Sequence, residues 1–197
     1  IGFPRENDEL LHGLHLSIER YRAASYSREL SGKVWKGCAK IAGGGFWAGG
    51  SPPFGMCRVL LDEKRVPVQV LGHGEHKAIH NQRVTLTPGD KHEVETVRRI
   101  FAAFADEGQP LPAIAETLNA DGKAAPGGGT WSAGTVRAIL GNEIYAGTMI
   151  WNKTSQKMKT RSRANPVAEW VRVTDAFDAI VAHGVFDRAQ AILRAEA

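Results

Sequence analysis

A proline followed by three glycines, at residues 126–129, is the feature that most constrains how this chain folds. Neither helix nor strand tolerates such a cluster, so it predicts a turn between two separate elements. Before the turn, a short helix runs into Asn119, and Gly122 can close it in the left-handed conformation. After the turn, Ser132 is a typical N-cap for a second helix, which we expect to end at Asn142. The sequence therefore predicts two helices joined by a glycine-rich turn.

The second of these helices has two contrasting faces. Helical spacing places three apolar residues on one side, and the opposite side is small and polar: Val136, Ile139 and Leu140 against Ser132, Ala133, Thr135 and Arg137. Residues 148–152 look like the first strand of a hairpin that returns at 170–173. Helix, turn, capped helix and hairpin together describe a helix-turn-helix with a wing-like ribbon. A DNA major groove admits a helix whose outer face is slim and carries hydrogen-bonding groups. An ordinary helical hairpin within a core is the alternative, and this stretch alone favours DNA binding only slightly.

Charge is distributed unevenly along the chain. The formal net charge is +4, with 25 Lys and Arg against 21 Asp and Glu. No acidic residue lies between Ile144 and Ala168, where the hairpin should be, and that stretch contains Asn152, Lys153, Lys157, Lys159, Arg161 and Arg163. Side chains of these types contact phosphates in nucleic-acid complexes. A solvated basic loop is the alternative, but the position beside a candidate recognition helix favours a polyanionic partner.

The chain begins with one long predicted helix, residues 8–40, with possible breaks near Gly13 and Gly32. Its first half is apolar at helical spacing: Leu10, Leu11, Leu14, Ile18 and Tyr21. Its second half is basic, with Arg28, Lys33, Lys36 and Lys40. Such a helix can lead from a packed interface onto phosphates. The alternative is a solvated helix end, where basic side chains also favour the C-terminal dipole.

Residues 43–55 predict an extended arm rich in glycine and proline. Gly49, Gly50, Pro52 and Pro53 let the backbone approach another surface closely, and a thin strand of this kind fits a minor groove. An inert linker is the alternative. The aromatic residues Phe46, Trp47 and Phe54 argue for some burial.

The remaining pattern predicts an α+β fold. We expect strands at 56–62 and 79–86 around a polar excursion at 63–77, an amphipathic helix at 91–107, a helix opened by Pro112 and a last helix at 186–193. The expected architecture is a mainly helical DNA-binding domain with a helix-turn-helix-like pair and a small antiparallel β-ribbon, preceded by a long helix. The predicted boundaries are 1–42 for that helix, 43–55 for the arm and 56–197 for the domain.

Cofactor and metal chemistry are not predicted. Cys38 and Cys57 lack the spacing of a zinc site or of a disulfide framework. His73, His76 and His80 lie close together, but neither cysteines nor a helix supports them as ligands. The sequence shows neither a signal peptide nor a membrane-spanning apolar run, which predicts a cytoplasmic protein without a membrane partner. Because it starts at Ile1, we expect a piece of a longer protein.

Five segments, taken in order, resemble the large serine recombinases, the phage integrase and transposon resolvase group. They are residues 26–37 (YSRELSGKVWKG), 45–55 (GFWAGGSPPFG), 94–122 (VETVRRIFAAFADEGQPLPAIAETLNADG), 130–152 (TWSAGTVRAILGNEIYAGTMIWN) and 177–193 (FDAIVAHGVFDRAQAIL). The resemblance implies a recombinase domain that reads part of a DNA half-site, preceded by the long linking helix. It also implies a cytoplasmic protein of bacterial or phage type. It also implies that the catalytic domain, which forms a phosphoserine link with DNA, lies upstream of Ile1.

Residue roles follow from the resemblance alone. Arg28, Lys33, Lys36 and Lys40 would hold phosphates near the crossover, Gly49, Gly50, Pro52 and Pro53 would follow the minor groove, and Ser132, Thr135 and Arg137 would face the major groove. Ser17, Ser25, Ser27 and Ser31 lack the surrounding arginines that a nucleophilic serine needs, so this chain should be inactive in strand exchange by itself.

The leading hypothesis is sequence-specific binding of double-stranded DNA by a fragment of a site-specific serine recombinase, with self-association of the parent through the leading helix. A winged-helix transcriptional regulator is the alternative, although it does not predict the basic helix and arm. An RNA-binding module would use Trp47, Trp131 and Trp151 for stacking, but no RNA-module signature accompanies them. An independent hydrolase has no triad, carboxylate pair or phosphate loop to support it. The leading hypothesis expects the basic groups of helix, arm and ribbon to converge on one track along DNA.

Overall fold

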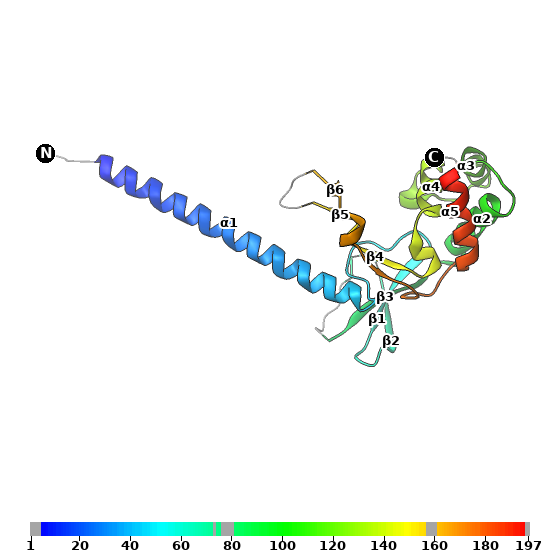
Figure 1. The fold of residues 1–197 in the computed structure, drawn as a ribbon, viewed down its shortest axis with the longest axis horizontal. Coiled ribbons are helices and arrows are strands. Elements are labelled where there is room, and N and C mark those ends of the chain that lie inside the picture. Colours follow the sequence, from blue (N-terminus) through cyan, green and yellow to red (C-terminus); the bar gives the residue numbers. More distant parts are fainter. Residues whose placement is uncertain (1–4, 73, 76–80, 157–160, 196–197) are drawn as a thin grey trace. The chain divides into compact units, whose positions relative to one another are not determined.

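The computed structural model describes residues 5–72, 74–75, 81–156 and 161–195 (Figure 1). The chain divides into two compact units, one up to Lys40 and the other from Ile41 onward. Each unit is described by itself below.

The first unit consists of the long helix α1 (Arg5–Gly43), whose last three residues belong to the second unit. The predicted helix is confirmed, but the predicted breaks are wrong, because α1 continues through Gly13 and Gly32. A glycine inside a helix costs only about 1 kcal/mol relative to alanine, so flanking helix-forming residues can outweigh it. The large apolar residues of α1 in the first unit are exposed; Leu10 and Tyr21, for example, are 73% and 70% accessible.

A glycine motif ends α1 inside the second unit. Gly45 has φ of 77°, and its backbone N–H donates to Ala42 O at 2.9 Å, while Phe46 N–H donates to Ile41 O at 3.2 Å. This pair of bonds satisfies the last carbonyl groups of the helix, and it needs a residue that adopts the left-handed conformation. Ala42 is fully buried, so the helix end is anchored in the core of this unit.

A three-stranded antiparallel sheet follows, with the order β2-β1-β3. Its strands are β1 (Met56–Leu61), β2 (Pro67–Leu71) and β3 (Arg83–Pro88). The first predicted strand is confirmed. The second begins at Arg83, and the first two residues of its predicted range lie outside the described residues. Strand β2 corrects the predicted polar excursion. Val68 and Val70 are exposed on this edge strand, and its short length and polar flanks hide it in the sequence.

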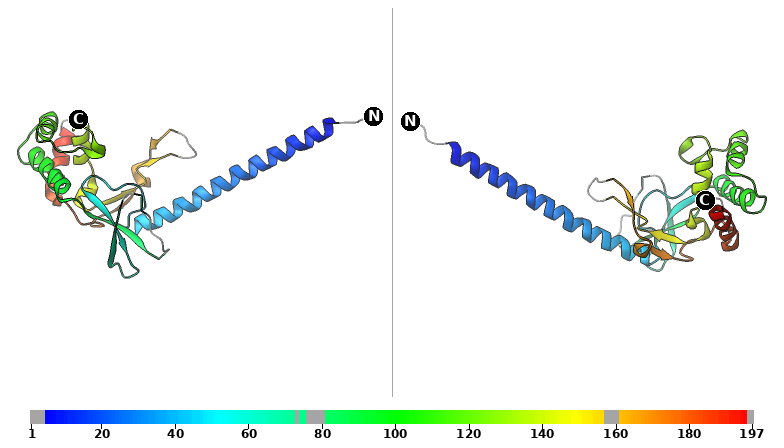
Figure 2. Two further views of the ribbon diagram at one scale, coloured as in Figure 1. Left: turned by 180° about the vertical axis from the view of Figure 1, so that it is seen from behind. Right: turned by 45° about the horizontal axis from the view of Figure 1, so that its top comes forward.

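Four helices form the core of the second unit. They are α2 (Lys91–Ala105), α3 (Leu111–Ala120), α4 (Ala133–Leu140) and α5 (His183–Ala195). Asp90 caps α2 by accepting from the backbone N–H groups of His92 and Glu93. The apolar stripe of α2 is buried, and Phe101 packs on Phe186 of α5 with ring centroids 6.0 Å apart. Both views of Figure 2 show these helices as one cluster beside the sheet.

Short elements complete the second unit. They are the 3₁₀ turns η1 (Pro126–Gly128), η2 (Glu143–Ala146) and η3 (Val167–Glu169) and the strands β4 (Met149–Trp151), β5 (Thr154–Ser155), β6 (Arg163–Ala164) and β7 (Val171–Val173). Strand β4 pairs with β7 and β5 pairs with β6, both antiparallel, as the hairpin pattern predicts. Gly147 is required between η2 and β4, because a Cβ there would lie 2.7 Å from Phe177 O. The α+β fold class is confirmed.

Candidate nucleic-acid interface

Helix α4 presents a narrow exposed face. Val136 and Leu140 are fully buried and Ile139 is nearly so, because they pack into the helical core. Gly134, Arg137 and Ala138, which share the other face at spacings of three and four residues, are exposed. Only Arg137 has a long side chain on this face. A helix with this outline can enter a major groove and place one guanidinium against base edges.

The beginning of α4 is fixed by its cap. Ser132 Oγ accepts from Thr135 N–H at 3.2 Å, and it lies 3.0 Å from Thr135 Oγ1. The predicted N-cap is therefore confirmed. The two hydroxyl groups predicted to contact DNA thus take part in the cap that starts the helix. Ser132 is exposed and Thr135 is half-buried.

Arg137 lies beside a groove of about 370 Å³. The groove is lined by the first residues of two helices: Pro110, Leu111 and Pro112 at α3, and Ala133 and Gly134 at α4. Among the described residues, no hydrogen bond or ion pair holds the Arg137 guanidinium. Its five donors are thus available to a ligand, and an arginine fork matches phosphate or guanine geometry.

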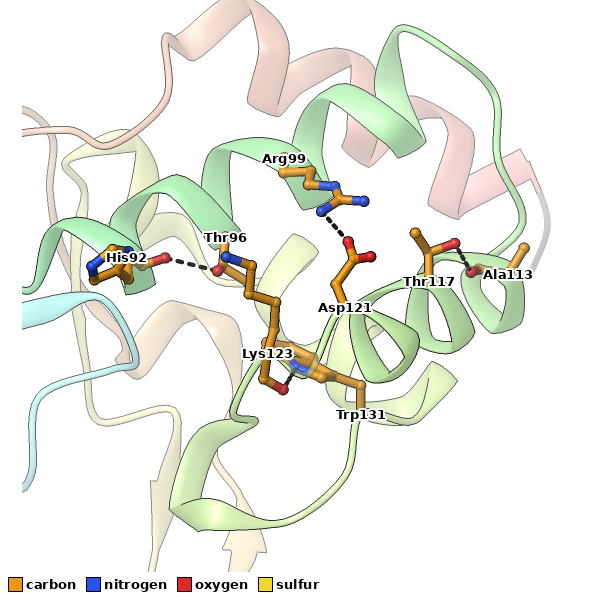
Figure 3. A network of polar contacts seen from close by, with 8 residues as sticks. All are labelled: His92, Thr96, Arg99, Ala113, Thr117, Asp121, Lys123 and Trp131. Atoms are coloured by element: carbon orange, nitrogen blue, oxygen red, sulfur yellow. Dashed lines mark hydrogen bonds and ion pairs between the residues drawn. The ribbon is translucent and has the colours of Figure 1, made fainter.

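The connection from α3 to α4 spans residues 121–132, far longer than the turn of a tight helix-turn-helix. Side-chain bonds close it. Asn119 Nδ2 donates to Trp131 O at 2.9 Å, and Trp131 N–H donates to Asn119 Oδ1 at 2.8 Å. Figure 3 shows the Trp131 indole N–H directed at Lys123 O, 3.0 Å away, beside the Arg99–Asp121 ion pair. Trp131 is 3% exposed, so the connection is tied to the core immediately before α4.

The described residues of the β5–β6 ribbon, 153–156 and 161–164, are mostly exposed. Lys153 Nζ lies 5.1 Å from the centroid of the Trp170 ring, a cation–π contact, and Arg161 and Arg163 are exposed. Lys157 and Lys159 lie outside the described residues. Asn152 has φ of 67°, donates to Glu169 O and accepts from Asn165 Nδ2. Its amide thus shapes the base of the ribbon, a role the sequence does not indicate.

The arm is held against the sheet. Trp47 N–H donates to Val84 O at 2.7 Å, at the edge of β3, and its indole N–H donates to Gly50 O at 3.1 Å. Gly49 and Gly50 are exposed and have φ of 124° and 91°, which only glycine adopts readily. Pro52 and Pro53 are half-buried. The end of the arm packs into the core: Tyr145 Oη donates to Phe54 O at 2.9 Å. Burial, aided by the charge of Glu93, raises the pKa of Tyr145 and keeps the phenol protonated as that donor.

In the first unit, all four predicted basic residues of α1 are exposed. Lys33, Lys36 and Lys40 share one face, and Lys33 Nζ pairs with Glu29 at 2.8 Å. Arg28 lies off that line, and its Nε donates to Ala24 O. The lysines form a continuous strip that can follow a phosphate backbone. Its convergence with the arm and the ribbon stays a prediction.

No group of three or more His, Cys, Asp or Glu residues in the described part of the chain is arranged to hold a metal ion, and His73, His76 and His80 lie outside that part. No helix among the described residues is long and apolar enough to cross a membrane. Sequence reasoning missed Gly134, Ala138 and Asn119 as parts of the α4 site; the small size of the first two, at helical spacing from Arg137, is the signal that was available.

Comparison with known proteins identifies the family. The Recombinase family matches residues 91–196, which comprise α2 to α5 and the hairpin. The chain belongs to this family, and the resemblance to recombinases is confirmed. No curated protein matches the chain. Among solved structures, one described as the crystal structure of an LSR–DNA complex is similar, with 16% sequence identity and a TM-score of 0.49 over 83% of this chain and 38% of that one.

Proposed function

We propose that this recombinase-family chain binds double-stranded DNA with sequence preference, as the DNA-binding part of a site-specific serine recombinase. In this proposal α4 enters the major groove, the ribbon and the lysine strip of α1 contact phosphates, and the arm follows the minor groove. The observation that carries the proposal is the exposed face of α4, where Arg137 stands between Gly134 and Ala138 with no partner among the described residues.

The two kinds of contact have different consequences. Arginine donates two hydrogen bonds to guanine O6 and N7, and such a pair discriminates against a wrong base by about 1–3 kcal/mol. Ribbon arginines on phosphates give affinity that does not depend on sequence, and each neutralised phosphate steepens the salt dependence by roughly 0.9 in log–log slope. The proposal therefore assigns specificity to α4 and general affinity to the ribbon.

The long helix and the arm have separate roles in the proposal. The apolar stripe of α1, exposed along Leu10, Leu14 and Tyr21, fits self-association of the parent protein. The nucleophilic serine and the phosphoserine chemistry belong to a part of the parent outside these residues. The division into linking helix (1–42), arm (43–55) and DNA-binding domain (56–197) belongs to the same proposal.

Selection from a randomised duplex library tests the proposal. The whole chain is incubated with duplexes that carry about 20 random base pairs, and bound DNA is amplified and sequenced over several rounds. A recurring motif is expected, together with a salt slope that indicates several phosphate contacts. Enrichment of no motif by a folded chain would contradict sequence-specific recognition.

Hydroxyl-radical footprinting on the selected duplex separates the proposal from a winged-helix regulator. Protection of the minor groove next to the α4 site is expected if the arm lies there. A minor groove that stays unprotected on the bound duplex would favour the regulator.

A further inference from the structure

The end of the arm and the start of α4 meet at one aromatic contact. The rings of Phe54 and Trp131 lie edge to face, with centroids 5.5 Å apart and an interplanar angle of 85°. Phe54 is near the end of the arm, and Trp131 immediately precedes the N-cap of α4. Two segments with different proposed DNA contacts therefore share a single packed joint.

Both partners of this joint are held by additional bonds. On the arm side, Tyr145 donates to Phe54 O, and Gly55 N–H donates to Glu93 Oε2 at 2.9 Å. On the helix side, the paired bonds with Asn119 fix the Trp131 backbone, and Lys123 O fixes its indole. The backbone of the arm at Phe54, and both the backbone and the indole of Trp131, are thus held by hydrogen bonds, and the ring contact joins these two fixed segments.

The geometry points to Phe54 and Trp131 as positioning residues that couple the arm to the base-reading orientation of α4. This inference rests on the proposed function. Helix α4 has only eight residues, so the contacts at its first turn contribute to its direction together with its buried apolar side. Loss of the joint leaves the phosphate-contacting side chains in place and lets the Arg137 fork depart from the geometry that a bidentate contact needs.

Loss of the Phe54–Trp131 contact is therefore expected to reduce discrimination between DNA sequences and to leave the affinity for DNA in general nearly unchanged. Phe54→Ala should lower the ratio of dissociation constants between scrambled and selected duplexes by about tenfold, within the range of couplings carried by packed side chains. Affinity for the scrambled duplex should change less than about twofold, because that binding is electrostatic. Tyr145→Phe, which removes one bond to the joint and keeps the ring, should give a smaller loss of the same ratio.

The matched control is Phe186→Leu, which removes a ring contact with Phe101 between α2 and α5. It should lower the melting temperature and keep the discrimination ratio. The experiment measures fluorescence anisotropy of the wild-type chain and the three variants on the selected duplex and a scrambled duplex, with melting temperatures in parallel. An unchanged ratio in Phe54→Ala and Tyr145→Phe, or an equal loss of affinity for both duplexes, would overturn the inference. A wild-type chain without discrimination would instead overturn the proposed function.

Discussion

Helix α4 and the β5–β6 ribbon are both candidate DNA-contacting surfaces, but they are built differently. The helix has a capped start, a buried apolar side and a connection closed by Asn119 and Trp131. The ribbon has two residues in each paired strand, and its arginines, Arg161 and Arg163, are exposed and have no acidic neighbour in the sequence. A rigid element can hold a side chain in the geometry of a base contact, whereas an exposed basic ribbon can adapt to a phosphate backbone. The difference assigns specificity to one surface and general affinity to the other.

The largest expected effect comes from filling the slim face of α4. Ala138→Glu places a carboxylate where the proposal puts the major groove, and binding to every duplex should weaken by more than about a hundredfold through like-charge repulsion. Glutamate favours helix, so the melting temperature should remain near the wild-type value. Ala138→Gln introduces a side chain of similar volume without the charge, so it should weaken DNA binding less than Ala138→Glu. Anisotropy titrations check the series, and full binding by Ala138→Glu would exclude α4 from the interface.

Removal of the Arg137 guanidinium comes next. Arg137→Ala should cost about 1–3 kcal/mol on the selected duplex, or about 5- to 150-fold, and should relax the preference at one base pair. Arg137→Lys keeps the charge but loses the planar fork, so it should recover affinity more than discrimination. The control is Arg194→Ala, which removes the same charge from the last turn of α5. Repeating the library selection with Arg137→Ala measures the effect; an identical motif would contradict base reading by this residue.

Substitution of the ribbon arginines should have the opposite effect to substitution of Arg137: general affinity should fall and sequence preference should stay the same. Replacement of Arg161 and Arg163 together by glutamine should weaken selected and scrambled duplexes by similar factors and reduce the log–log salt slope by roughly 0.9 for each lost phosphate contact. The selected motif should stay the same. Titrations at salt concentrations between roughly 50 and 200 mM measure the change in slope. A changed motif with an unchanged slope would reverse the roles assigned to ribbon and helix.

The smallest effect separates helix capping from DNA contact at Ser132. Ser132→Ala should lower stability by about 1 kcal/mol and the melting temperature by about 2–4 °C, because the Thr135 N–H loses its acceptor. Ser132→Asp preserves the cap and should keep the melting temperature, but its charge should weaken DNA binding. Calorimetry and anisotropy on the two variants distinguish the roles. Equal binding by Ser132→Asp and wild type would show that this position faces away from DNA.

Strong periodicity made much of the fold predictable. Some elements are specified by residues within or next to them. Examples are the repeated apolar spacing in α2, the serine before α4 and the glycine after α3. Strand β2 has only five residues and its alternating valines are exposed, so no buried pattern reveals it. The breaks expected at Gly13 and Gly32 overstated what one glycine does inside a long helix.

The site was less predictable, because its support is not local. The Asn119–Trp131 bonds join residues 12 apart, and the Tyr145–Phe54 bond joins residues 91 apart, so no periodicity encodes them. Asn152 has the composition of a phosphate-contacting residue, yet its amide bonds to the turn. Arg137 was predicted because helical spacing leaves it outside the apolar stripe of Val136, Ile139 and Leu140. Positions on a regular element can thus be assigned from sequence, and the contacts that orient the element require the structure.

The most direct test of major-groove recognition by α4 is an interference experiment on the selected duplex. Each purine in turn is replaced by its 7-deaza analogue, which removes the N7 acceptor from the major groove and leaves the minor groove unchanged. At least one substitution should weaken wild-type binding strongly and have no further effect on Arg137→Ala, because both changes remove the same contact. Wild-type binding that tolerates every substitution, or equal interference in Arg137→Ala, would contradict base reading through this helix.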